Sequence, residues 1–391
     1  METTKTTDPQ QKRRRRAFRI QDVLLIIFVA VAIISYFVPA PGRATTTKQE
    51  QQAIKVTSLL LESSTPQNDW TRNLLLRLDK VRAHCGVACL VDSGNALQAL
   101  LLVNENDKNP SPLPHVKANW DCPALLALEE IDAGDTTFPA RPPTELQRFY
   151  DWNGAVEWKQ RKIFREAQLG GNTLQFEWPH AEIEDMKQKA KQGTLEGTYG
   201  RKITKSFYQR LLQVQHLFQD KHILVIGSQK PWVEAMALAL GAKHVTTLEY
   251  GEIHSTHAQI STETPASMRQ RVAHQGKHIQ PIFDGVISLS SLEHSGLGRY
   301  GDALNPWGDI LAVARASCLS KPGAFFVLNV PTGKDKVEWN WHRIYGPLRM
   351  PLLMTNWKAL PVDQFAPNAV LQDMAEKPDD WLNGLFVFTK V

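Results

Sequence analysis

The chain has 391 residues, of which 42% are hydrophobic and 22% charged, a balance typical of a globular protein and too apolar for a disordered one. Its net charge of +5 resides entirely in residues 1–43, where eight basic residues face three acidic ones. A nucleic-acid-binding domain normally carries its excess positive charge on the folded body. The charge distribution therefore argues against nucleic acid as a partner, and at roughly 100–200 residues per domain the length allows two domains.

An apolar segment follows the basic N-terminus. Residues 23–38 contain no charge, and the stretch from Ile20 nearly crosses a hydrocarbon core of about 30 Å at a rise of about 1.5 Å per residue. Because the arginine-rich residues 12–19 precede it, the positive-inside rule places the N-terminus in the cytosol. We therefore expect a single-pass type II protein in the lipid bilayer, with its C-terminal part in the lumen of the endoplasmic reticulum or Golgi. The alternative is a cleaved signal peptide, since residues 38–40 loosely resemble a cleavage site.

Five segments follow one another along the chain. A basic cytosolic tail (1–22), a transmembrane signal anchor (23–40) and a polar stem (41–55) come first. Residues 56–200 are predicted to form a mainly helical region, because their apolar residues recur at roughly helical spacing and proline-rich loops interrupt them. Residues 201–391 are predicted to form an α/β domain.

Short apolar or β-branched runs alternate with amphipathic stretches in the C-terminal domain. This alternation predicts βαβ units and a Rossmann-like, doubly wound, mostly parallel sheet. The predicted strands cover residues 222–227, 244–250, 283–289, 324–330 and 385–391, and the predicted helices cover 203–218, 231–240 and 307–319.

Ligands of such sheets bind beyond the carboxyl ends of the strands. Gly227 closes the first predicted strand and would let the backbone approach a ligand. Glu249 ends the second predicted strand, where a carboxylate can accept hydrogen bonds from both hydroxyls of a ribose. The predicted cofactor-binding residues are Gly227, Ser228, Gln229, Glu249, Tyr250 and Ser290.

These segments resemble the class I S-adenosylmethionine-dependent methyltransferases. The stretch FDGVISLSSLEH resembles the fourth strand of that superfamily with its following Glu-His, and LSKPGAFFVLNVP resembles the turn into its fifth strand. The stretches GSQKPWVEAMALALGAKHVTTLEYGEI, SLEHSGLGRYGDALNPWGD and WNWHRIYGPLR also closely resemble the nematode-rich domain of unknown function 268, over about residues 201–360. The resemblance implies a class I methyltransferase-like fold with S-adenosylmethionine as its cofactor, and puts Glu249 at the position of the ribose-binding acid.

One motif departs from the superfamily pattern. An acid in the first strand and a Gly-x-Gly-x-Gly loop would be expected, whereas the chain has Val225 and the loop residues 227–231, which contain one glycine. The missing acid would normally help to hold the methionine end of the cofactor, and Lys230 would oppose its sulfonium charge if it pointed inward. The chain either holds the cofactor unusually or has kept the fold without it, because fold alone does not imply activity.

A polar cluster follows the predicted strand at 283–289. His294 is expected to act as a general base that Glu293 orients, with Arg299 as a further catalytic residue. The structural alternative has His294 stabilising the loop and Arg299 paired with Asp302. Residues 339–345 are expected to line the same crevice or to pack against residues 145–180. The predicted substrate-binding residues are Tyr300, His342, Arg343 and Tyr345.

Four cysteines would lie in an oxidising compartment, where thiols tend to pair. Cys85 and Cys89 are four residues apart on a predicted helix, so Cys122 is expected to pair with one of them and Cys318 to stay free and buried. His84 beside the first two cysteines does not match a zinc spacing, and we predict no metal site.

Two functions are compatible with these patterns. The first is a membrane-anchored methyltransferase that acts on a small molecule or a glycan. The second is a non-catalytic binding or scaffold protein, in which Trp232 or Gln229 would fill the gap between the first two strands. A glycosyltransferase ranks last, because the sequence has no Asp-x-Asp motif to hold a metal–nucleotide pair.

Overall fold

The computed structural model describes residues 69–89, 116–128, 141–142, 144–160, 175–275, 279–300, 302–360 and 385–391. The chain divides into two compact units, residues 1–65 and 66–391, and all described residues belong to the second. The predicted tail, anchor and stem lie outside the described residues. Within the described ranges, no helix is both long and apolar enough to cross a membrane.

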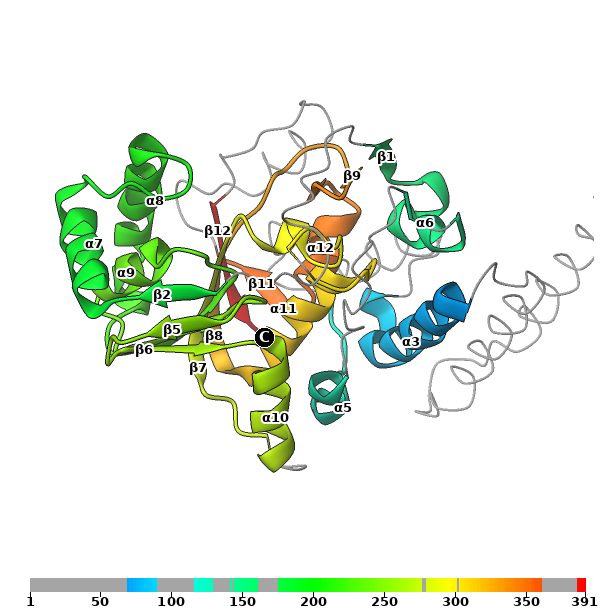
Figure 1. The fold of residues 1–391 in the computed structure, drawn as a ribbon, viewed down its shortest axis with the longest axis horizontal. Coiled ribbons are helices and arrows are strands. Elements are labelled where there is room, and N and C mark those ends of the chain that lie inside the picture. The colour runs from blue at the N-terminus through cyan, green and yellow to red at the C-terminus, as the bar shows by residue number, and fades with distance from the viewer. Residues whose placement is uncertain are drawn as a thin grey trace, which may run out of the picture. The chain divides into compact units, whose positions relative to one another are not determined.

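Seven strands form the central sheet (Figure 1). In order across the sheet they are β11 (Trp357–Ala359), β12 (Leu385–Lys390), β8 (Ser320–Asn329), β7 (Phe283–Leu289), β3 (His222–Ile226), β4 (His244–Leu248) and β6 (Ile260–Glu263). The strands from β8 to β6 pair in parallel, and β12 is antiparallel to both of its neighbours.

The strand order reverses between β3 and β7. The chain runs outward from β3 to β4 and β6, and then returns to place β7 on the other side of β3. In an open α/β sheet such a reversal opens a crevice at the carboxyl ends of the two strands, and ligands bind there.

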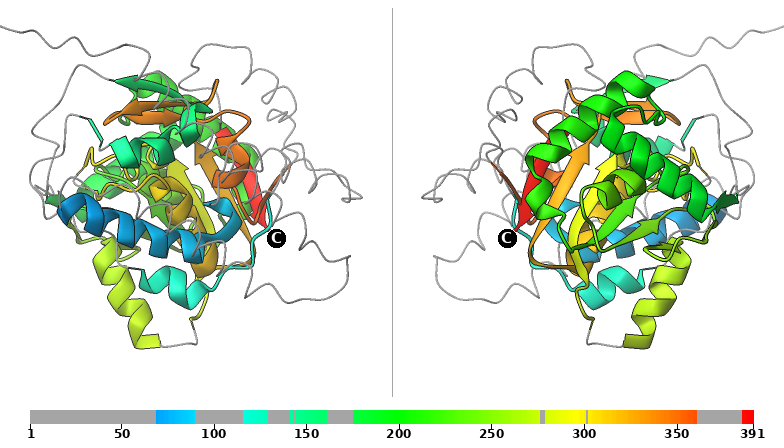
Figure 2. Two further views of the ribbon diagram at one scale, coloured as in Figure 1. Left: turned by 90° about the vertical axis from the view of Figure 1, so that its right-hand side faces the viewer. Right: turned by 90° about the vertical axis from the view of Figure 1, so that its left-hand side faces the viewer.

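Helices cover both faces of the sheet (Figure 2). One face packs against α7 (His180–Gln192), α8 (Arg201–Gln213) and α9 (Trp232–Ala239). The other face packs against α3 (Asp69–Cys85), α5 (Cys122–Ala127), α10 (Pro265–Gln275) and α11 (Gly308–Leu319).

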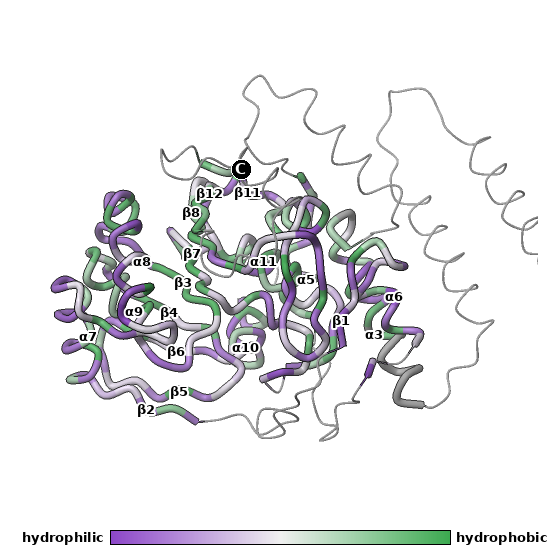
Figure 3. The backbone as a smooth tube through the Cα atoms, turned by 90° about the horizontal axis from the view of Figure 1, so that it is seen from above, coloured by the Kyte–Doolittle hydropathy of each residue, from purple (hydrophilic) through white to green (hydrophobic). Residues whose placement is uncertain are grey.

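Strand residues alternate between these two cores. Ile223 and Val225 of β3 belong to the first core, and Leu224 and Ile226 belong to the second. Because both faces are buried, the inner strands read as continuous apolar runs, which Figure 3 shows along β3, β7 and β8.

The segment before the central sheet joins the segment after β8. A three-stranded sheet contains β1 (Glu157–Gln160), which is parallel to β9 (Lys336–Trp339), and β10 (His342–Ile344), which is antiparallel to β9. The helices α6 (Thr144–Tyr150) and α12 (Arg349–Leu353) belong to the second core. A further parallel pair links β2 (Phe176–Trp178) to β5 (Ile253–Ser255), and short 3-10 helices cover Gly86–Ala88, Trp152–Gly154, Gln215–Leu217 and Leu292–His294.

The structure contains every strand and helix predicted for the C-terminal domain, with shifted ends. The predicted strand at 244–250 ends at Leu248, so Glu249 and Tyr250 lie in the loop that follows. The predicted helix at 203–218 ends at Gln213 and is followed by a 3-10 turn. The sequence pattern missed β6, whose four residues are too few to show a period.

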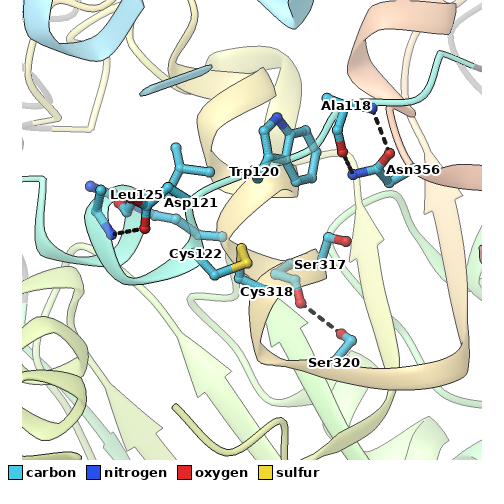
Figure 4. Close-up of a disulfide and its surroundings, with 12 residues drawn as sticks. Ala118, Trp120, Asp121, Cys122, Leu125, Ser317, Cys318, Ser320 and Asn356 are labelled. Carbon is cyan, nitrogen blue, oxygen red and sulfur yellow. Dashed lines mark hydrogen bonds between the residues drawn. A yellow bond between two sulfur atoms is a disulfide. The ribbon is translucent and has the colours of Figure 1, made fainter. Parts of the chain in front are cut away.

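The predicted disulfide pairing is wrong. The structure pairs Cys122 with Cys318 and Cys85 with Cys89, each pair with Cα atoms 5.5 Å apart (Figure 4 shows the first). The α-helix that contains Cys85 ends at that residue and a tighter 3-10 turn follows, so Cys85 and Cys89 do not share a regular helix. Cys318 is buried as expected but is bonded, because α5 packs against α11.

Candidate functional site

A crevice opens at the carboxyl ends of β3, β4 and β7, where the strand order reverses. Its walls come from the loops after these strands, from the segment before α8, and from the facing sides of α9, α10 and α11. His294 and Tyr300 line the crevice. So do all six predicted cofactor-binding residues, which are Gly227, Ser228, Gln229, Glu249, Tyr250 and Ser290.

Gly227 closes β3 in a conformation that suits glycine. Its φ is +74°, and its N–H donates to the Leu248 carbonyl at 2.9 Å. A Cβ at this position would collide with the Ser291 side chain. The lack of a Cβ at Gly227 therefore lets the Ser291 side chain, from the loop after β7, lie against the loop after β3.

Glu249 faces this glycine loop from the end of β4. One carboxylate oxygen accepts the Ser228 N–H at 2.8 Å, and the other accepts the Tyr250 N–H at 2.8 Å. Burial raises the pKa of Glu249, and these backbone hydrogen bonds oppose the rise. A backbone hydrogen bond from Gly251 also acts on this carboxylate, so about one of its roughly four lone-pair sites remains for a ligand hydroxyl.

A second carboxylate, Glu234, lies beneath the loop. It is fully buried in the first turns of α9, where its oxygens lie 2.8 Å from the Thr247 hydroxyl and 3.1 Å from that of Ser228. Burial raises the pKa of Glu234 to about 7. The Ser228 hydroxyl also donates to the Lys230 carbonyl at 2.8 Å. A protonated Glu234 that donates to Ser228 satisfies both hydrogen bonds at once.

His294 has a defined tautomer. Its Nδ1 lies 2.5 Å from the Trp341 carbonyl, which can only accept, so Nδ1 carries the hydrogen and Nε2 carries a lone pair. Arg299 donates to the same carbonyl at 3.3 Å and stacks on the Trp341 ring at 4.0 Å. Burial first, and then the charge of Arg299, lower the pKa of His294 to about 3, so the ring is neutral near pH 7.

A chain of hydrogen bonds joins Tyr199, in the segment before α8, to the loop after β7. The Tyr199 hydroxyl donates to Ser290 Oγ at 2.5 Å, and Ser290 Oγ donates to Glu293 Oε1 at 2.5 Å. Ser290 has a φ of +52°, an unfavourable conformation for a serine. Glu293 lies behind Ser290 and is only 1% exposed, so it reaches the crevice through the serine.

The structure does not bring the predicted substrate-binding residues His342, Arg343 and Tyr345 to the crevice, and this expectation needs correction. All three are fully buried on and after β10. Tyr345 donates to Asp309 at 2.8 Å, and the Arg343 guanidinium donates to the Ser295 carbonyl at 2.5 Å. These residues stabilise the second core, as the packing alternative anticipated.

Two further alternatives can be compared with the geometry. Asp302 accepts the N–H groups of Gly296, Gly298 and Tyr300, so it stabilises the loop of residues 296–300. It does not form the ion pair with Arg299 that the structural alternative contained. Lys230 is exposed and does not line the crevice. The objection that its charge would repel a sulfonium group therefore does not apply.

Among the described residues, neither Trp232 nor Gln229 fills the crevice at the ends of β3 and β4. Trp232 forms part of the crevice wall, but its ring stacks on Phe207 at 6.4 Å and is 4% exposed, and Gln229 is exposed. The scaffold hypothesis required one of these side chains to fill the notch, and the geometry does not favour it.

Some site residues were missed by sequence reasoning. Tyr199 lies before the first helix of the predicted domain and carries no motif. Trp341 belongs to the segment 339–345 that was expected near the crevice, but the hydrogen bond of its backbone carbonyl to His294 could not be predicted. Glu234 is the one acidic residue in the otherwise apolar helix WVEAMALA. An isolated acid in an apolar helix was the sequence feature that could have identified it as a buried site residue. In the described ranges, no group of three or more His, Cys, Asp or Glu residues is placed to hold a metal ion.

The sheet order and the crevice define an α/β protein with a methyltransferase-like fold. Residues 220–369 match the family described as "Caenorhabditis protein of unknown function, DUF268", in agreement with the resemblance found in the sequence. No curated protein matches the chain.

Solved structures that resemble the chain include several methyltransferases. A putative S-adenosylmethionine-dependent methyltransferase from Listeria monocytogenes is 16% identical, with a TM-score of 0.28, over 46% of this chain and 99% of that one. The 1,6-didemethyltoxoflavin-N1-methyltransferase of Burkholderia thailandensis, solved with S-adenosylhomocysteine, is 13% identical, with a TM-score of 0.32, over 54% and 87%. An O-methyltransferase from Bacillus cereus, also in complex with S-adenosylhomocysteine, is 14% identical, with a TM-score of 0.28, over 54% and 90%.

Proposed function

We propose that the crevice binds S-adenosylmethionine and that the chain transfers its methyl group to a small molecule or a glycan. The observation that carries the proposal is the position of Glu249 opposite Gly227 at the strand-order reversal. A buried carboxylate just beyond the carboxyl end of a parallel strand suits a ribose hydroxyl. Gly227 lines the crevice beside it with backbone atoms alone, and the Ser291 side chain occupies the space that a Cβ would take.

The residues present fit the proposed cofactor. Glu249 would hold its ribose, the backbone of Gly227 and Ser228 would lie against its chain, and Met268 offers an apolar wall for a base. When bound, S-adenosylmethionine supplies an electrophilic methyl group. His294 keeps an unprotonated Nε2, and we propose that this atom accepts a hydrogen bond from the methyl acceptor and orients it, because a ring with a pKa of about 3 is too weak a base to hold the acceptor's proton near pH 7.

A titration tests the binding part of this proposal. Full-length chain in detergent micelles is titrated calorimetrically with S-adenosylmethionine. Glu249→Ala should weaken binding about 10- to 100-fold, because a hydrogen bond to a charged group contributes roughly 1.5–3 kcal/mol. Glu252→Ala, at an exposed position three residues later, is the matched control and should bind like the wild type. A flat titration of the wild type at millimolar cofactor would refute the proposal.

We also propose that the chain is anchored in the bilayer through residues 23–40, with residues 56–391 in the lumen of the endoplasmic reticulum or Golgi. The charge-free segment and its basic flank support this topology. Two disulfides also support it, because such bonds persist in oxidising compartments. In sealed vesicles, added protease should leave the C-terminal part intact until detergent is present. Its digestion without detergent would refute the topology.

A further inference from the structure

The acid that would normally hold the amino-acid end of the cofactor is missing from β3. Val225 occupies that position and is 1% exposed in the core between the sheet and α8 and α9, so it can offer no charge to the crevice. The amino-acid end of S-adenosylmethionine carries an ammonium group, whose three donors need acceptors once water is removed.

Glu293 has an unused acceptor behind the crevice wall. Its carboxylate is 1% exposed, and Oε1 accepts the Ser290 hydroxyl. Oε2 is buried and has no hydrogen-bond partner among the described residues. Glu293 itself does not line the crevice, so a donor supplied by a ligand can act on its charge only through the Ser290 hydroxyl, which does line it.

The groups around Glu293 do not provide that donor. His294 Nε2 lies 3.7 Å from Oε1, beyond hydrogen-bond distance, and it carries a lone pair because Nδ1–H donates to Trp341. The Tyr199 phenol donates to Ser290, and burial raises its pKa to about 12, so it stays protonated. The other titratable or charged groups that act on Glu293 are Arg299, Tyr300 and Tyr345.

We infer that Glu293, acting through the Ser290 hydroxyl on the crevice wall, is the counter-ion for the ammonium group at the amino-acid end of the cofactor. It replaces, from the loop after β7, the acid that β3 lacks. The inference rests on the proposed function. Ser290 is suited to this role because it lines the crevice, and its positive φ is a strained conformation of the kind that clusters at ligand sites.

A proton should accompany the cationic ligand. Burial raises the pKa of Glu293 to about 7, while the Ser290 hydrogen bond and Arg299 oppose the rise, so the carboxyl is about half protonated at pH 7. A bound cation stabilises the ionised form and lowers this pKa. Binding at pH 7 should therefore release about half a proton from Glu293.

Two ligands separate this effect from binding of the nucleoside. S-adenosylhomocysteine carries the ammonium group, whereas 5′-methylthioadenosine has the same nucleoside and no amino-acid end. Full-length chain is titrated with each ligand at pH 7 in phosphate and in Tris, whose heats of ionisation differ, so that the number of released protons follows from the difference in heat. Any proton released from Glu249 on ribose binding is common to both ligands and cancels in the comparison.

We expect the wild type to release about half a proton more with S-adenosylhomocysteine than with 5′-methylthioadenosine. Glu293→Gln should abolish that difference and weaken S-adenosylhomocysteine binding about 10- to 100-fold. The variant should bind 5′-methylthioadenosine like the wild type, which shows that it is folded. Glu252→Gln, at an exposed position, should change neither quantity.

The possible failures have different meanings. If neither ligand binds to the wild type, the proposed function is wrong and the inference falls with it. If both ligands bind but Glu293→Gln keeps the affinity and the proton release of the wild type, the inference alone is wrong. Equal loss of both ligands in Glu293→Gln also overturns it, because the residue would then stabilise the whole loop.

Discussion

Replacing Gly227 with alanine should destabilise the protein more than the same change at another glycine with the same backbone conformation. Gly227 has a φ of +74° and Gly323 a φ of +73°. An alanine in this region costs roughly 1–2 kcal/mol at either site. At Gly323 nothing lies within 4 Å of the added Cβ, whereas at Gly227 the Cβ collides with Ser291, whose own Cβ would be 2.6 Å away. Forcing atoms into such a packed site costs roughly 1–3 kcal/mol more.

We therefore expect Gly227→Ala to lower the free energy of unfolding by about 2–5 kcal/mol and Gly323→Ala by about 1–2 kcal/mol. Urea unfolding of both full-length variants, followed by tryptophan fluorescence, measures the difference. Gly227→Ala should also weaken binding of S-adenosylmethionine, because the displaced Ser291 side chain lines the crevice. Equal losses of stability in the two variants would refute the idea that the loops after β3 and β7 touch at this glycine.

Two further predictions concern bonds and charges away from the crevice mouth. The Cys122–Cys318 disulfide spans 196 residues, so replacing both cysteines with serine should lower the free energy of unfolding by up to about 5 kcal/mol. The Cys85–Cys89 disulfide spans four residues, and its removal should cost about 2 kcal/mol. A lower urea midpoint for the variant without Cys85–Cys89 would contradict this prediction. Glu234 has a folded-state pKa of about 7, raised above its unfolded value, so the stability from its protonated form is full below about pH 4.5 and is lost as the pH rises through 7. That loss is about 3 kcal/mol in the free energy of unfolding. Glu234→Gln should remove this part of the pH dependence of stability between pH 5 and 8. If the variant keeps the wild-type slope of stability against pH, Glu234 is ionised over this whole range.

The strands that form the crevice could be predicted because their signal is local. β3 and β7 are buried on both faces, so each is a continuous apolar run that ends at a polar turn, and Gly227 marks the first of these ends. Once parallel strands are inferred, their carboxyl ends must meet at one edge, which brings Glu249 to Gly227 without further information.

The roles of the other site residues and the disulfide pairing depend on tertiary contacts that no local sequence pattern shows. Arg343 and Tyr345 have the side chains of a ligand site, and only the tertiary structure shows that Asp309 and backbone carbonyls satisfy them inside the core. The disulfide between Cys122 and Cys318 likewise depends on α5 packing against α11. Glu293 was identified as polar and near the site, but its unpartnered oxygen appears only when its neighbours are placed.

The pairing of β1 with β9 limits how the chain can be cut. Tyr150, from the helix just before β1, donates to the carbonyl of Gly296 in the loop that follows β7. Trp158 of β1 stacks on Trp339 of β9. A fragment that starts at residue 201 would lose these partners and expose the edge of β9 and one face of the Trp339 indole. Such a truncated protein should aggregate or bind poorly for reasons unrelated to its chemistry, so inactivity in it would say nothing about the intact molecule.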